Sequence, residues 1–160
     1  LDMSELQTVS RDETIAVDAL VDEVLVDLEP LAQEKEIKLI GNCKDTTMVG
    51  SDILIYRMVY NLVENAIKYN HFGGQVTVTA YRKGKSICLS VEDTGSGIPA
   101  ELKERIFEPF FRVDKSRSRQ LGGVGLGLAL VREIVRVHDG RITVQSSPSG
   151  GTIFEVVFTQ

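Results

Sequence analysis

The hydrophobic period changes repeatedly along the chain, and this alternation constrains the possible folds more than any other feature. Residues 18–31 and 52–69 carry apolar side chains at helical spacing, so each is predicted to be a helix with one buried face. Residues 75–82 and 86–92 instead alternate apolar and polar side chains on either side of a Lys-Gly-Lys turn, which predicts a β-hairpin. Helices interleaved with hairpins favour an α/β fold, a two-layer sandwich in which helices cover one face of a mixed, mostly antiparallel sheet.

Shorter patterns complete the predicted order of elements. They are strands over residues 13–16, 37–40, 47–49, 141–147 and 152–159, a short helix over residues 100–106, and a long helix over residues 125–137. Asp18 is a candidate N-cap of the first helix, and Pro30 predicts a kink or a break within it. Residues 114–123 combine charge, serine and glycine without periodicity, which predicts a mobile loop.

The composition favours a single globular domain that neither binds nucleic acid generally nor inserts into a membrane. A length of 160 residues fits one domain, and the net charge of −5 argues against a general nucleic-acid surface. Cys43 and Cys88 are far apart in the sequence and form no CxxC pair, which favours a reduced, cytosolic protein. The sequence has no run of 18 apolar residues, so this fragment is not expected to insert into a membrane.

The predicted second long helix carries three polar residues on one face. Asn61, Asn65 and Lys68 are spaced at i, i+4 and i+7, so their side chains project in the same direction. One interpretation is a solvated face opposite the apolar stripe. The other is a ligand-binding face, in which an asparagine oxygen coordinates Mg²⁺ and the lysine provides a positive charge for a phosphate group.

Two glycine-containing loops are further candidates for a binding site. Residues 93–99 (DTGSGIP) form a turn in the simpler interpretation, but Asp93 at a strand end could also accept a hydrogen bond from an adenine amino group. Residues 122–128 (GGVGLGL) lead into a predicted helix, where each glycine costs about 1 kcal/mol relative to alanine. Glycines at a helix N-terminus present N–H groups and the positive end of the helix dipole to phosphates. The run matches neither a P-loop nor a Rossmann fingerprint.

A fourth motif, FEPFFRVD, occupies residues 107–114. Some of its aromatic side chains are expected to form a small hydrophobic cluster. Arg112 and Arg117 gather positive charge just before the glycine run. One interpretation is a solvated charge run; the other, supported by the position next to a candidate phosphate-binding loop, is a role in ligand binding.

In this order, the asparagine-rich helix, DTGSGIP, FEPFFR and GVGLGL resemble the N, G1, F and G2 boxes of the histidine-kinase catalytic domain, a member of the GHKL ATP-binding superfamily. The resemblance covers about residues 17–158. It implies a Bergerat-type α/β sandwich that binds ATP and Mg²⁺ between the N-box helix and a flexible lid. It also implies a part in two-component signal transduction.

The resemblance implies a role for each matching position. Asn65 resembles the Mg²⁺ ligand, Asn61 a polar group near the phosphates, and Asp93 the residue that binds adenine. The implied catalytic residues are Asn61, Asn65, Lys68 and Arg112. The implied nucleotide-binding residues are Asn65, Lys68, Tyr69, Asp93, Gly95, Gly97, Ile98, Arg112, Arg117, Gly123, Val124, Gly125, Leu126 and Gly127.

Asn61 bears on the type of reaction. ATPases of the gyrase, Hsp90 and MutL type resemble one another in having a glutamate four residues before the Mg²⁺ asparagine, where it activates water. A carboxamide cannot act as a general base, so Asn61 favours phosphoryl transfer over attack by water. The alternatives are a regulatory nucleotide-binding domain, and an ATPase or serine kinase of the same superfamily; the serine kinases lack a typical F box.

The phosphoacceptor is expected on another domain. Histidine kinases phosphorylate a histidine of a dimerising helical domain, and neither His71 in a turn nor His138 at a helix end is expected to be that residue. Residues 1–12 are interpreted as a remnant of the preceding dimerisation helix and linker, and residues 13–160 as the ATP-binding domain. The implied partners are the dimerisation domain and, through it, a response regulator. The resemblance further implies a cytoplasmic domain whose parent protein is anchored in the bacterial plasma membrane.

Overall fold

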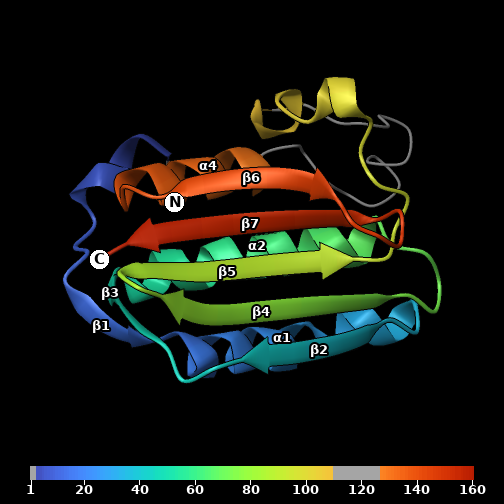
Figure 1. The fold of residues 1–160 in the computed structure, drawn as a ribbon, viewed down its shortest axis with the longest axis horizontal. Coiled ribbons are helices and arrows are strands. Elements are labelled where there is room, and N and C mark those ends of the chain that lie inside the picture. Colours follow the sequence, from blue (N-terminus) through green and yellow to red (C-terminus); the bar gives the residue numbers. More distant parts are fainter. Residues whose placement is uncertain (1–2, 110–126) are drawn as a thin grey trace.

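The computed structural model describes residues 3–109 and 127–160, and within these ranges the chain forms two layers (Figure 1). One layer is a five-stranded sheet with the order β2-β4-β5-β7-β6. The other layer consists of helices that lie across one face of this sheet. The two-layer α/β sandwich predicted from the sequence is therefore confirmed.

Most strand pairs of the five-stranded sheet are antiparallel. β2 and β4 pair in parallel, whereas β4 with β5, β5 with β7, and β7 with β6 pair antiparallel. The bounds are β2 (Lys38–Cys43), β4 (Gln75–Lys83), β5 (Ser86–Asp93), β6 (Arg141–Ser146) and β7 (Thr152–Thr159). A separate pair, β1 (Glu13–Ala16) and β3 (Thr47–Gly50), lies at one end of the molecule (Figure 1).

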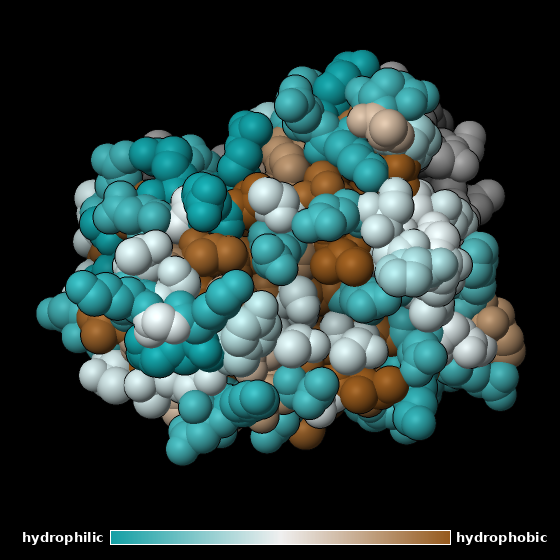
Figure 2. Space-filling view, viewed as in Figure 1, coloured by the Kyte–Doolittle hydropathy of each residue, from teal (hydrophilic) through white to brown (hydrophobic). Residues whose placement is uncertain are grey.

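Long helices in the described ranges are α1 (Val17–Glu34), α2 (Asp52–Lys68) and α4 (Gly127–Val137). The apolar stripe of α2, which includes Leu62 and Val63, is buried in the core with alternate strand residues such as Val78 and Leu89. Because strand side chains alternate between the two faces, the same strands present their other residues on the opposite face. Figure 2 looks onto that open face, where hydrophilic side chains surround scattered hydrophobic ones.

Both ends of α2 are fixed by side chains. At its start, the Ser51 side chain accepts a hydrogen bond from the Leu54 amide, which satisfies one of the free N–H groups of the first turn. At its end, the Lys35 ammonium donates to the carbonyl oxygens of Ile67, Lys68 and Asn70 at 3.2, 2.9 and 2.8 Å. A cation at this position also complements the negative end of the helix dipole. The helix that carries the predicted N-box residues is thus firmly terminated.

Three local expectations differ from the structure. The N-cap of α1 is Ala16 and not Asp18, because β1 runs directly into the helix and Asp18 falls in its first turn. The break considered at Pro30 is wrong, since α1 continues to Glu34. The helix predicted over residues 100–106 is replaced by two 3-10 turns, η2 (Ala100–Leu102) and η3 (Arg105–Phe107), and the second of these directs adjacent Ile106 and Phe107 into the core.

The N-terminal segment also packs on the domain. It forms a 3-10 helix, η1 (Met3–Thr8), next to α4. Leu6 of this helix is only 1% exposed and belongs to the hydrophobic core. The described part of the N-terminal segment is therefore an integral part of the packed structure.

Candidate functional site

Segments that are far apart in the sequence meet at the C-terminal half of α2. The Asn61 amide nitrogen in α2 donates a hydrogen bond of 3.5 Å to the carbonyl oxygen of Gly127, the first residue of α4. The loop after β5 contacts α2 two turns further along: a Cβ on Gly95 would lie only 2.6 Å from the Tyr69 carbonyl oxygen. The structure thus brings the predicted N-box helix against both the DTGSGIP loop and the start of α4.

Asp93 is the buried carboxyl group of this site. Its side chain Oδ1 accepts hydrogen bonds from the backbone N–H groups of Gly95 at 2.8 Å and Thr152 at 3.3 Å. Burial raises the pKa of Asp93 above its ordinary value, and the two N–H donors oppose that effect. Within the described residues, Oδ2 accepts no hydrogen bond, so this oxygen is available to a donor on a ligand.

Two glycines of the same loop are required by close backbone approach. Gly95 lies against the Tyr69 carbonyl, as described above, and Gly97 adopts a φ of 78° beside the carbonyl oxygen of Gly150. Side chains at these positions would push the loop away from α2 or from the β6–β7 turn. Ile98 is partly buried and packs against the core, so it anchors the end of the loop.

The polar face of α2 is neither fully solvated nor buried. Asn61, Asn65 and Lys68 are all partly exposed, on the side of α2 away from its buried stripe. Lys68 also lies 3.8 Å from Glu64 of the preceding turn. Tyr69 follows as the C-cap residue and is partly exposed as well. The loop after Asp93 meets α2 at Tyr69, and α4 meets it at Asn61, so this half-covered row of amide and ammonium groups suits the ligand-binding interpretation better than a purely solvated face.

Part of the predicted site falls outside the described residues. Arg112, Arg117, Gly123, Val124, Gly125 and Leu126 lie there. Gly127 is described and stands exposed at the start of α4. The predicted adenine-side and N-box positions can therefore be compared with the structure, whereas the arginines and most of the glycine run stay predictions.

Sequence reasoning does not identify Asn70, its partner Thr94 or Gly151 as residues that shape this site. Asn70 adjoins a predicted turn, yet it is 1% exposed and hydrogen-bonded to Thr94 of the DTGSGIP loop. Gly151 also falls in a predicted turn, yet a Cβ there would collide with the Asp93 carbonyl oxygen. An Asn that follows the N-box closely and precedes a Gly-Gly turn is the only available signal for the first pair. Nothing in the sequence points to Gly151.

The side chains present fit a magnesium ion shared with a ligand better than a metal held by protein alone. Within residues 3–109 and 127–160, no group of three or more His, Cys, Asp or Glu side chains is placed to hold a metal. Asn65 offers a carboxamide oxygen on the partly exposed face of α2. Mg²⁺ commonly takes one or two protein oxygens and completes its shell with water and phosphate oxygens.

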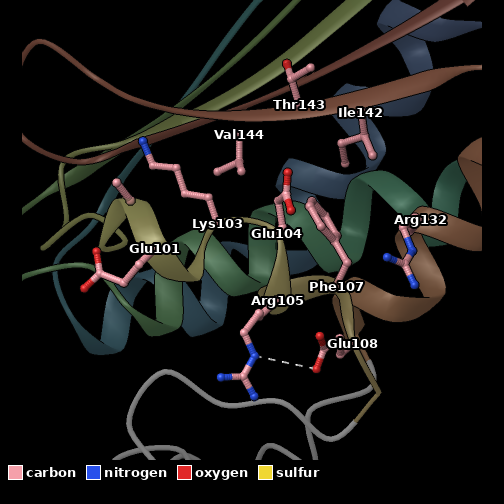
Figure 3. Close-up of a pocket in the computed structure, with 11 residues that line it drawn as sticks. Glu101, Lys103, Glu104, Arg105, Phe107, Glu108, Arg132, Ile142, Thr143 and Val144 are labelled. Atoms are coloured by element: carbon pink, nitrogen blue, oxygen red, sulfur yellow. Dashed lines mark ion pairs between the residues drawn. The ribbon is translucent and has the colours of Figure 1, made fainter.

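A separate groove lies next to β6. It has a volume of about 960 Å³ and runs between β6 and the η2–η3 segment (Figure 3). Its apolar side is formed by Phe107, Ile142 and Val144, and its rim carries charged side chains, with Arg105 and Glu108 paired at 3.8 Å. None of the described residues that line it is a predicted nucleotide-binding residue, although Phe107 and Glu108 belong to the FEPFFRVD motif.

Both a family model and a curated relative connect this chain with histidine kinases. The family model described as "Histidine kinase-, DNA gyrase B-, and HSP90-like ATPase" matches residues 50–160. The Sensor-like histidine kinase SenX3 of Mycobacterium tuberculosis is 38% identical over 158 residues, which is 96% of this chain and 38% of the relative. This chain thus spans about two fifths of the length of that curated relative.

Solved structures extend the similarity to three dimensions. The catalytic domain of histidine kinase ThkA matches with a TM-score of 0.83 and 27% identity, covering 94% of this chain and 96% of that chain. ThkA in complex with the response regulator protein TrrA matches with a TM-score of 0.78 and 26% identity, covering 92% of this chain and 41% of that chain. The predicted resemblance to histidine-kinase catalytic domains is thereby confirmed. Among the described residues, no helix is both long enough and apolar enough to cross a membrane.

Proposed function

We propose that this chain, which belongs to the family of histidine kinase-, DNA gyrase B- and HSP90-like ATPases, works as the ATP-binding catalytic domain of a histidine kinase. In this role it binds Mg²⁺-ATP and presents the γ-phosphoryl group to a histidine on a separate domain of the parent protein. The observation that carries the proposal is the meeting of the Asp93 loop with the C-terminal end of α2 at Tyr69, because it joins an acceptor for adenine to the helix that carries the candidate contacts for phosphates.

Asp93 supports recognition of the adenine base. Its Oδ1 is held by the N–H groups of Gly95 and Thr152, which fixes the carboxylate in one orientation. The remaining oxygen is then positioned to accept a hydrogen bond from the adenine amino group. Since the carboxylate is buried, that bond forms away from competing water, where a charge-assisted hydrogen bond is stronger.

The polar face of α2 and the start of α4 suit the phosphates. Asn65 would hold Mg²⁺, which neutralises phosphate charge when bound. Lys68 lies one turn further along α2 and adds a positive charge that is partly shielded from solvent. The N-terminal end of α4 adds the positive end of its dipole beside Asn61. We propose that Arg112 and Arg117 complete this set of cations.

Two features favour transfer to another domain. At position 61 an amide, bound to the Gly127 carbonyl, stands where a hydrolase needs a base for water. Both ring nitrogens of His138 are engaged, one with the Ser51 N–H at 3.0 Å and the other with the Ile134 carbonyl at 2.8 Å. His138 is thus a structural residue and a poor phosphoacceptor. Among residues 3–109 and 127–160, no feature gives comparable support to the hydrolase, serine-kinase or purely regulatory alternatives.

The proposal extends to partners and location. The acceptor would be a histidine of a dimerisation domain that precedes this one, with residues 1–12 as the connection. A response regulator would then contact that domain, as the complex of ThkA with TrrA suggests by analogy. A cytoplasmic location and a membrane-anchored parent protein stay predictions of the family resemblance.

Nucleotide titration of three variants tests the site. Asp93→Ala should weaken ATP and ADP with or without Mg²⁺, because the base contact is lost in every case. Asn65→Ala should weaken mainly the binding that depends on Mg²⁺. Asn42→Ala, which alters an exposed asparagine on β2, serves as the matched control and should bind like the unchanged chain. Unaltered ATP and ADP affinity in both site variants would exclude the proposed site.

A further inference from the structure

We infer that Asn70 is a positioning residue that fixes the Asp93 loop against the end of α2 that carries Lys68 and Tyr69. The inference rests on the proposed function, since it concerns the geometry of that same nucleotide site. The proposed base contact, Asp93, lies at the end of β5, whereas the proposed phosphate contacts, Asn65 and Lys68, lie on α2. The distance between them therefore depends on the interactions that join these two segments. Asn70 follows the C-cap of α2 directly and is buried between them.

The side chain of Asn70 makes hydrogen bonds to three different segments. Its Oδ1 accepts from the His71 N–H at 2.8 Å and from the Thr94 hydroxyl at 3.1 Å. Its Nδ2 donates to the carbonyl oxygen of Gln75, the first residue of β4, at 3.0 Å. The His71 N–H can only donate and the Gln75 carbonyl can only accept, so the orientation of the amide is fixed. A donor and an acceptor are both required at this position.

Thr94 closes the network from the other side. Its hydroxyl accepts a hydrogen bond from the Gln75 N–H at 3.0 Å while it donates to Asn70. Its backbone N–H also donates to the Gln75 carbonyl at 3.3 Å. Thr94 immediately follows Asp93, so this closed ring of bonds connects the end of α2 to the residue next to the adenine-binding carboxylate.

The backbone around the network leaves little freedom. A Cβ on Gly74 would fall on Asn70 Oδ1 and within 2.7 Å of the Thr94 hydroxyl, so the pair occupies all the space there. A Cβ on Gly95 would lie 3.2 Å from the Asn70 Cα. Lys35 holds the Asn70 carbonyl at 2.8 Å. The side chain is thus packed as well as hydrogen-bonded, which limits movement of the loop relative to α2.

A fixed distance between the Asp93 loop and α2 should increase the affinity for ATP. ATP must reach Asp93 with its base and Asn65 and Lys68 with its phosphates at the same time. If the two segments moved independently, binding would have to order them first, and that entropy would reduce the affinity. Asn70 would therefore affect nucleotide binding without contacting the nucleotide.

Asn70→Asp is the sharpest test, because it keeps the shape of the side chain but replaces the donor with an oxygen that faces the Gln75 carbonyl. At neutral pH we expect the affinity for ATP, measured by calorimetry below the melting temperature, to fall about tenfold, equivalent to about 1.4 kcal/mol. Protonation of the new carboxyl group restores a donor, so the ratio of variant to unchanged affinity should rise toward one as the pH falls. Lys35, His71 and Asp93 are the ionisable groups near this position, and using the ratio removes their common effect on both proteins.

Two further variants complete the design. Thr94→Val removes the hydroxyl without adding a titratable group, so it should weaken ATP binding at every pH by a constant ratio. It also decides the question if Asn70→Asp fails to fold. Asn42→Asp introduces the same charge change on an exposed strand residue and should leave the affinity unchanged.

The outcomes separate this inference from the proposed function. Weaker ATP binding in Asn70→Asp that recovers at low pH, or a constant loss in Thr94→Val, supports the positioning role. If both variants bind ATP like the unchanged chain, or show only a lower melting temperature, the positioning role is refuted. Absence of nucleotide binding by the unchanged chain would instead contradict the proposed function itself.

Discussion

Asp93→Asn is the substitution that most closely probes base recognition. The backbone N–H groups of Gly95 and Thr152 can only donate, so the amide of an asparagine must turn its oxygen toward them. Its NH₂ group then replaces the oxygen that is proposed to accept from adenine. The change therefore exchanges an acceptor for a donor at one atom and leaves the surrounding bonds in place.

Asp93→Asn should affect ATP affinity and folding stability differently. A hydrogen bond to a charged group is worth about 1.5–3 kcal/mol, so its loss should weaken ATP binding by about ten- to a hundredfold. Stability should not fall in parallel, because burial raises the pKa of Asp93 and thus disfavours its charged form, which asparagine does not have. We expect the melting temperature without nucleotide to be equal or higher.

A second nucleotide sharpens the test. Inosine triphosphate carries a carbonyl oxygen where ATP carries the amino group, so it can accept a hydrogen bond from the NH₂ group that only the Asp93→Asn variant offers. Competition titrations of ATP and inosine triphosphate against the unchanged chain and the variant would measure the ratio of the two affinities. The ratio should shift toward inosine triphosphate in the variant. An unchanged ratio together with unchanged ATP affinity would refute the assignment of Asp93 to the base.

Other consequences of the same geometry can be measured in solution. ATP affinity should fall as acid protonates Asp93, because the protonated carboxyl group is a weaker acceptor for adenine. The contribution of Asp93 to folding stability should rise over the same range, because its folded-state pKa is raised. Nucleotide titrations and thermal melts in matched buffers would show whether affinity and stability move in opposite directions. Burial lowers the pKa of His138, so the free energy of unfolding should fall as the pH drops below 6.5 and level off below the folded-state pKa; a His138→Asn variant should lack this dependence in denaturant titrations. Gly151→Ala should cost about 1–3 kcal/mol of stability by overpacking against the Asp93 carbonyl, and it should also weaken ATP binding. Denaturation and ATP titration curves like those of the unchanged chain would contradict the close approach of Gly151 to Asp93.

Local patterns are sufficient to predict most elements of the fold. The stripe of α2 and the hairpin of β4 and β5 depend on hydrophobic period and turn residues that lie close together in the sequence. The predicted N-cap of α1 is wrong because the helix follows β1 without an intervening residue, so the position of the strand and not the capping preference decides where the helix begins.

Within the site, too, features that depend on neighbouring residues can be predicted from the sequence, whereas contacts between distant segments cannot. The closeness of Gly95 to α2 agrees with a motif whose glycines permit close backbone approach. The bond between Thr94 and Asn70 joins residues 24 apart, and that between Thr152 and Asp93 joins residues 59 apart. Such pairs depend on how β4, β5 and β7 line up in the sheet, which no local pattern determines.

Transfer of the γ-phosphoryl group of ATP to a histidine on another domain is the activity proposed for this domain. The most direct measurement mixes the chain with Mg²⁺ and γ-labelled ATP in the presence of a purified dimerisation domain that carries the acceptor histidine. We expect label on the acceptor domain that is lost in acid and kept in base, which is the behaviour of phosphohistidine, and that is greatly reduced by Asn65→Ala. Release of inorganic phosphate without a labelled acceptor, or label that survives acid, would contradict it.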